Sequence, residues 1–351
     1  MQTNLSNDRL QWLDGLRGIA ILLVVGVHFS IKQRYGVELG MSNTGYSSFL
    51  SDVLDIGAFG VQLFYMISGF TMCYMWNIYP KENKIRNFFI RRFFRLSPMF
   101  YLMIIIPAIT HYLVRGEFDL TRFILSLLFI TDFTTYGSYA PGGGTIDMEF
   151  TFYLIFPFIV VFMNKLYMPA LWIVITLMWA YFNSKYNIFD KYEFILYQGM
   201  FFVTGGYLYH LYKQQTFKNI FSNYYILPIW IIVTLIVLNY HDSFIVFEPR
   251  NSVIILFTFA ILILSAMYST STILTNKAMV FFGTISFSLY LLHFVILSAS
   301  SSIIKTYGGM GFGFAGYLYL LGLSSLVLYL SYKYIEKNGI NMGKKIIKGL
   351  K

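Results

Sequence analysis

The chain alternates between long apolar runs and short polar stretches along its whole length. Eleven runs approach or exceed the roughly 17–25 apolar residues that a helix needs to cross a bilayer. They lie at 15–31, 49–76, 96–114, 120–136, 149–164, 167–183, 194–212, 225–240, 252–268, 279–304 and 312–334. The pattern predicts an all-α, polytopic bundle of transmembrane helices without a soluble domain, in which residues 1–351 form a single integral membrane domain.

Two polar stretches, 77–95 and 335–351, are strongly basic. Because loops rich in lysine and arginine stay on the cytoplasmic side, we predict that both are cytoplasmic. The number of membrane crossings between the two stretches must then be even. Nine apolar runs lie between them, so one of the nine is not a full span. The run 120–136 is the one we expect not to be a full span, because Asp119 precedes it and Asp132 lies within it. The prediction is ten spans, or eleven if this run crosses, with both termini in the cytoplasm.

The amino-acid composition is typical of a membrane protein, so we expect the lipid bilayer to be one of its partners. The mean hydropathy is +0.62 and 12% of residues are charged, whereas soluble domains have about 25%. The net charge of +10 is concentrated in the stretches between apolar runs, as membrane topology requires, so we predict no nucleic-acid partner. A single cysteine, Cys73, excludes an internal disulfide and a thiolate metal site, and we expect no metal.

The first apolar run contains both Arg17 and His28. Eleven positions at about 100° per residue bring the two side chains to one helix face, roughly 16 Å apart along the axis. Ionisable residues inside a membrane are costly, so they are functional candidates by default. The alternative is that Arg17 extends to the lipid headgroups beside Asp14, and that His28 forms a hydrogen bond with a neighbouring helix.

Five short segments combine polar and aromatic residues within or beside the apolar runs. They read LDGLRGIAILLVVGVHF (13–29), GVQLFYMISGF (60–70), RRFFRLSPMFY (91–101), GGTIDMEFTFYLIFP (143–157) and ISFSLYLLHF (285–294). Together, and in this order, they resemble the motifs of the membrane-bound acyltransferase family 3, bacterial enzymes that O-acylate surface glycans. The chain departs from the family pattern at Gly144, where tryptophan is frequent, and after Glu336, where a proline is missing.

The resemblance implies an acyltransferase of the bacterial cytoplasmic (inner) membrane. It implies transfer of an acyl group, in the simplest case acetyl, from cytoplasmic acetyl-CoA to a hydroxyl of a lipid-linked or surface carbohydrate. Lipopolysaccharide O-antigen or capsule units fit this description best. Since the donor carries phosphates, we expect Arg92 and Arg95 to bind it, with Arg17 either extending that site inward or anchoring Asp14. Arg91 is more simply a topology signal.

His28 is the residue we expect to carry the chemistry, because a neutral imidazole can take the proton of an attacking hydroxyl. The family pattern suggests Glu149 as its carboxylate partner. Two mechanisms stay open: His28 as a general base, or His28 as a nucleophile that is itself acylated. Further residues could line the path of the substrates: Asp14, Ser68, Tyr153, Tyr290 and His293. For Ser68 the alternative is close helix packing, and for His293 a hydrogen-bonded place in the core.

A different class of protein could also carry charges inside the membrane. An exporter or flippase of glycans or lipid-linked sugars would line its path with such residues. It would release no thiol from acetyl-CoA, and it leaves the order of the five motifs unexplained.

Overall fold

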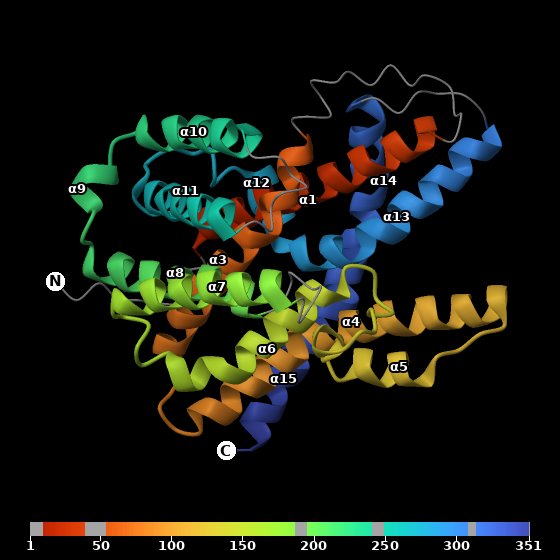
Figure 1. The fold of residues 1–351 in the computed structure, drawn as a ribbon, viewed down its shortest axis with the longest axis horizontal. Helices are drawn as coiled ribbons and strands as arrows, with labels where there is room; N and C mark the ends of the chain where they lie inside the picture. Colours follow the sequence, from red (N-terminus) through yellow and green to blue (C-terminus); the bar gives the residue numbers. More distant parts are fainter. Residues whose placement is uncertain (1–9, 39–53, 187–194, 241–248, 308–313, 351) are drawn as a thin grey trace.

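The computed structural model describes residues 10–38, 54–186, 195–240, 249–307 and 314–350, and within these ranges the chain is helical without any β-strand (Figure 1). The all-α prediction is confirmed for this part of the chain. In order, the elements are α1 (Gln11–Glu38), η1 (Ile56–Phe59), α3 (Gly60–Ile78), α4 (Lys84–Arg115), α5 (Leu120–Leu127), η2 (Thr131–Phe133), α6 (Gly143–Ile159), α7 (Tyr167–Tyr186), α8 (Ile195–Gln214), α9 (Lys218–Phe221), α10 (Ile226–Tyr240), α11 (Pro249–Tyr268), α12 (Lys277–Thr284), α13 (Ser286–Tyr307), α14 (Phe314–Ser331), η4 (Tyr332–Glu336) and α15 (Lys337–Gly349).

By length and composition, four helices of the described residues can cross a membrane. They cover Gln11–Ser30, Ile56–Ile78, Lys84–Arg115 and Asn251–Tyr268, and the bent pair α12–α13 makes a fifth if it counts as one span. The number of ten spans is therefore not confirmed, and the cytoplasmic location of the termini stays a prediction. The first residues of the predicted runs 49–76, 194–212 and 312–334 lie outside the described ranges.

The run 120–136 does not cross the membrane as a helix. Its only α-helix, α5, has eight residues and is about 12 Å long, less than half of a hydrocarbon core. The side chain of Arg122 donates hydrogen bonds to the carbonyl oxygens of Gly137 and Ser138, which folds the following loop back onto α5. Figure 1 shows α5 lying beside the second half of α4. The prediction that this run is not a full span is confirmed.

Large apolar side chains cover much of the outer surface. Leu113 and Val114 of α4 are 74% and 82% exposed, and Phe158 at the end of α6 is 73% exposed. Many residues of α7 and α10 are exposed in the same way. A soluble monomer rarely shows apolar surface on this scale, so these faces are the ones that contact lipid.

The two basic stretches meet in the structure. The second one forms α15, which packs along the first half of α4, with Gly339 and Gly343 facing Phe94. The lysines of α15 point away from this contact and are exposed: Lys337, Lys344, Lys345 and Lys348. Because α15 and the start of α4 touch, both stretches lie on the same side of the membrane.

Helices α3 and α8 pack backbone against backbone. A β-carbon at Gly69 would lie 1.9 Å from the carbonyl oxygen of Phe202, and one at Gly205 would lie 1.9 Å from that of Met66. Small residues permit such close approach between membrane helices. The packing role considered for the segment around Ser68 therefore applies to Gly69.

We expect Gly205→Val to destabilise the protein by about 3 kcal/mol, because the new side chain must push α3 and α8 apart. The matched control is Gly322→Val in α14, where a β-carbon meets no atom of the described residues within 4 Å. Thermal unfolding in detergent, followed by tryptophan fluorescence, measures both variants. Equal shifts of the unfolding temperature in the two variants would show that the close packing at Gly205 does not matter.

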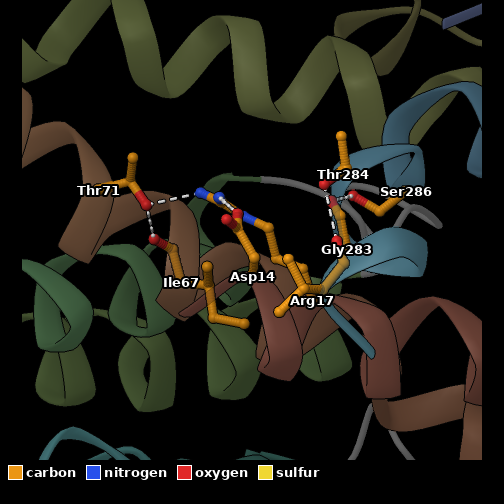
Figure 2. Close-up of polar contacts among 8 residues, drawn as sticks. Asp14, Arg17, Ile67, Thr71, Gly283, Thr284 and Ser286 are labelled. Carbon is orange, nitrogen blue, oxygen red and sulfur yellow. Dashed lines mark hydrogen bonds and ion pairs between the residues drawn. The ribbon is translucent and has the colours of Figure 1, made fainter. Parts of the chain in front are cut away.

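The predicted span 279–304 is not one straight helix. It is divided at Ile285 into α12 and α13, which meet at an angle of 75°. Gly283 lies against the backbone of Asp14 in α1. The hydroxyl of Ser286 donates a hydrogen bond to the carbonyl oxygen of Gly283, a local contact that competes with regular helix hydrogen bonding. The break brings the first turn of α13 next to α1 (Figure 2).

Candidate active site

A pocket that contains three arginines lies where α1, α3, α4, α6 and α13 meet, and we call it the arginine pocket. Its lining consists of Arg17, Phe64, Tyr65, Ser68, Arg92, Arg95, Thr145, Ile146, Glu149, Ser286, Phe287 and Tyr290. Six of these are candidates from the sequence: Arg17, Ser68, Arg92, Arg95, Glu149 and Tyr290. The pocket thus gathers residues from all five motif segments, including three arginines and one glutamate.

Arg17 points into the arginine pocket and is held from two sides. Its guanidinium donates to Asp14 Oδ1 at 3.3 Å and to Thr71 Oγ1 at 2.7 Å, and Thr71 donates in turn to the carbonyl of Ile67 (Figure 2). Asp14 is 5% exposed, so this ion pair is buried. Arg17 thus pairs with Asp14 and also lines the arginine pocket beside Arg92 and Arg95, while its role in donor binding stays a prediction.

Arg92 and Arg95 line the same pocket, as their spacing of three residues predicts. The Arg92 side chain is 5% exposed and lies over the rings of Tyr153 and Phe88, at 5.1 and 5.7 Å from their centroids. Within the described residues, its Nε has no hydrogen-bond partner. Arg92 is thus a buried cation that contacts two aromatic rings, and its Nε–H is available to donate a hydrogen bond.

Arg91 takes a different position from its neighbour. Its guanidinium lies 4.9 Å from the ring centroid of Tyr79, and it is not among the residues that line the arginine pocket. This agrees with the interpretation of Arg91 as a topology signal.

Glu149 places a carboxylate among the arginines. Its Oε1 accepts hydrogen bonds from Ser68, at 2.7 Å, and from Tyr153, one turn later on α6. Its carboxylate lines the same pocket as Arg17 and Arg95 and has the opposite charge. Glu149 is therefore fixed in the arginine pocket by one residue of α3 and one of its own helix.

The two candidate histidines form a second group, the histidine cluster, made of His28, His293 and Phe294. The ring centroids of His28 and His293 are 4.8 Å apart, and that of Phe294 is 4.6 Å from His28 and 4.0 Å from His293. Both histidines direct Nδ1 to a carbonyl oxygen of their own helix, that of Val24 for His28 and that of Tyr290 for His293. His293 is 1% exposed, whereas His28 is half-buried.

Tyr290 joins the two groups. It lines the arginine pocket, and its ring centroid lies 5.7 Å from that of His293, one helical turn further along α13. Its hydroxyl donates to the carbonyl of Gly142, just before α6, at 3.1 Å. Tyr290 thus contacts the histidine cluster while it lines the arginine pocket.

The suggested pairing of Glu149 with His28 is wrong in this structure. Glu149 accepts from Ser68 and Tyr153 beside the arginines, whereas His28 contacts the Val24 carbonyl and His293. The reason is the length of α1: Glu149 lies near Arg17, and His28 follows roughly 16 Å further along that helix. His28 is also not among the residues that line the arginine pocket.

Two residues of this region were not predicted as site residues. Glu336 is 4% exposed and accepts a hydrogen bond from Ser288 at 2.8 Å. Its negative charge favours the positive charge of Arg95. The signal in the sequence is a lone carboxylate at the end of an apolar run. Thr71, which holds Arg17, lies three residues after Ser68 and so shares its helix face.

Among the described residues, no three His, Cys, Asp or Glu side chains are grouped to hold a metal.

The fold and the site define an integral membrane protein with a charged pocket inside its helical bundle. The chain belongs to the acyltransferase family 3, because the family model described as an acyltransferase domain matches residues 10–332. Over 188 residues it is 26% identical to the peptidoglycan O-acetyltransferase OatA of Listeria monocytogenes, an alignment that covers 48% of this chain and 27% of that protein. The chain thus spans about a quarter of the length of this relative. No solved structure matches the chain significantly.

Proposed function

We propose that this protein transfers an acyl group, in the simplest case acetyl, from cytoplasmic acyl-CoA to a hydroxyl of a surface or lipid-linked carbohydrate at the bacterial cytoplasmic membrane. Membership of the acyltransferase family supports the class of reaction, the transfer of an acyl group. The observation that carries the specific proposal is the arginine pocket with a histidine cluster next to it.

The donor site of this proposal is the arginine pocket. Acyl-CoA carries phosphates and cannot cross the bilayer, so it needs cations at the cytoplasmic end of the bundle. Arginine is suited to this role because its guanidinium gives two parallel hydrogen bonds to a phosphate. Among the described residues Arg92 Nε has no hydrogen-bond partner, and a phosphate at this position would accept from it.

The chemical step of the proposal takes place at His28. The hydroxyl oxygen of the acceptor attacks the thioester carbon, the carbon–sulfur bond breaks, and the hydroxyl proton goes to His28 Nε2. The proton then passes to the departing thiolate, so that an ester and free CoA are formed. An acyl-histidine intermediate at His28 is the second form of the mechanism, and it would let donor and acceptor bind in turn.

The acceptor of the proposal is a glycan of the cell envelope. The relative described above is, by its name, an O-acetyltransferase of peptidoglycan. Capsule and lipopolysaccharide O-antigen units offer the same chemistry, a sugar hydroxyl presented on the far side of the membrane.

Surface glycans from cells with and without the gene test this proposal. We expect mass spectrometry to show one additional acyl group per modified unit, and NMR to show shifted protons at the acylated ring position. Cells that carry the gene with His28→Ala serve as the control and should match the cells without it. Identical glycans in the three strains would contradict the proposed function.

The exporter alternative is tested on the purified protein. Incubated with acetyl-CoA and membrane vesicles from the producing strain, an acyltransferase releases free thiol, and His28→Ala does not. An exporter releases none in either case.

A further inference from the structure

We propose that Glu149 limits the affinity of the arginine pocket for acyl-CoA and for the CoA product, because its carboxylate repels the phosphates that Arg92 and Arg95 attract. This inference rests on the proposed function, in which the arginine pocket binds the phosphates of the donor. It gives Glu149 a role in place of the pairing with His28, which the structure does not contain.

The carboxylate of Glu149 shares a small space with three arginines. Glu149 lines the arginine pocket together with Arg17, Arg92 and Arg95. The volume of the pocket is about 70 Å³, less than the roughly 150 Å³ of a cavity that holds a benzene ring. A phosphate that binds to the arginines in this space therefore lies close to the carboxylate.

Glu149 is not an ion-pair partner of these arginines. Among the described residues, Arg17 pairs with Asp14, and neither Arg92 nor Arg95 forms an ion pair with Glu149. No direct contact with a cation therefore neutralises the negative charge of Glu149. This charge acts on any anion that enters the pocket.

Two hydroxyl groups hold Glu149 in place. Its Oε1 accepts hydrogen bonds from Ser68 of α3, at 2.7 Å, and from Tyr153 of α6. To turn away from an arriving phosphate, the carboxylate would have to give up both bonds. Hydrogen bonds to an ionised group are among the stronger ones in proteins, so the carboxylate stays beside the bound phosphate.

A carboxylate at this position affects the empty and the occupied pocket in opposite ways. Without a ligand, its negative charge compensates part of the positive charge of the arginines. With a ligand, it lies next to a charge of the same sign, which weakens binding. Acetyl-CoA and CoA carry the same phosphates, so the limit applies to the donor and also to the product, which must leave before the next turnover.

The variant Glu149→Gln tests the inference, because it removes the charge and keeps an oxygen that can accept from Ser68 and Tyr153. Equilibrium binding of acetyl-CoA and of CoA to the purified protein measures the affinity. We expect Glu149→Gln to bind both about 10-fold more tightly than the unmodified protein, since a like charge is removed from the phosphate site. Differences in affinity at one site are mostly differences in the dissociation rate, so CoA should leave the variant about 10-fold more slowly.

Two controls separate the charge at this position from other effects. Glu149→Asp keeps the charge on a shorter side chain, and its affinity should stay within about threefold of normal. Glu82→Gln removes an exposed negative charge from the basic stretch 77–95, outside the pocket, and should also stay within about threefold because solvent and salt screen that charge. If Glu149→Gln is not recovered in folded form, Glu149→Asn and Glu149→Asp are a pair of equal size that differs in charge.

Three results would overturn the inference. The first is unchanged affinity in Glu149→Gln, and the second is weaker binding, which would make Glu149 an acceptor of hydrogen bonds from the donor. The third is equal tightening in Glu82→Gln or in Glu149→Asp. Failure of the proposed function gives a different result, because the unmodified protein would then not bind acetyl-CoA, or would bind it without transferring acetyl.

Discussion

Replacing His28 with alanine is expected to lower the rate of acyl transfer by about 10²–10⁴-fold while leaving the affinity for acetyl-CoA nearly unchanged. The rate falls because the attacking hydroxyl loses the group that takes its proton. The affinity is retained because His28 is not among the residues that line the arginine pocket. Thiol release and [¹⁴C]acetyl-CoA binding to the purified protein measure the two effects separately.

The same variant distinguishes the two mechanisms. In the absence of acceptor, an acyl-histidine intermediate would leave ¹⁴C-acetyl bound to the unmodified protein and none to His28→Ala. A general base would leave the protein unlabelled in both cases. Retention of more than a tenth of the normal rate by His28→Ala would remove His28 from the chemical step under either mechanism.

Replacing Arg92 and Arg95 together with alanine is expected to weaken acetyl-CoA binding by about 100-fold or more. Hydrogen bonds to charged groups contribute about 1.5–3 kcal/mol each, so the loss of two such partners exceeds a factor of 100. At saturating acetyl-CoA the rate should fall much less, because neither arginine belongs to the histidine cluster. Equilibrium binding and the KM for acetyl-CoA measure the effect.

Arg91→Ala is the matched control for the two arginines. It removes the same charge one position away, from a side chain that lies over Tyr79 outside the arginine pocket. We expect its affinity for acetyl-CoA to stay within about threefold of normal. If Arg91→Ala weakened binding as much as the double variant, net charge at the membrane surface would explain the effect, and the assignment of the donor site would fail.

Local regularities account for what could be predicted from the sequence. The apolar runs predict helices because a bilayer leaves the backbone few other ways to satisfy its hydrogen bonds. The spacing of Arg92 and Arg95 places both on adjoining faces of one helix, and they do line one pocket. The number of spans could not be confirmed in the same way, because helices covered by protein need not match the bilayer in length or hydropathy.

The sequence by itself determined which side chains share a helix face: Arg17 with His28, Ser68 with Thr71, and Tyr290 with His293. Only the tertiary structure decided which faces meet. Glu149 bonds to Ser68, 81 positions away, and lies with the arginines instead of His28, while His293 of α13 meets His28 of α1. The physical reason is that helical periodicity sets angles within one helix, whereas the rotation of each helix and the break at Ile285 follow from packing with distant residues.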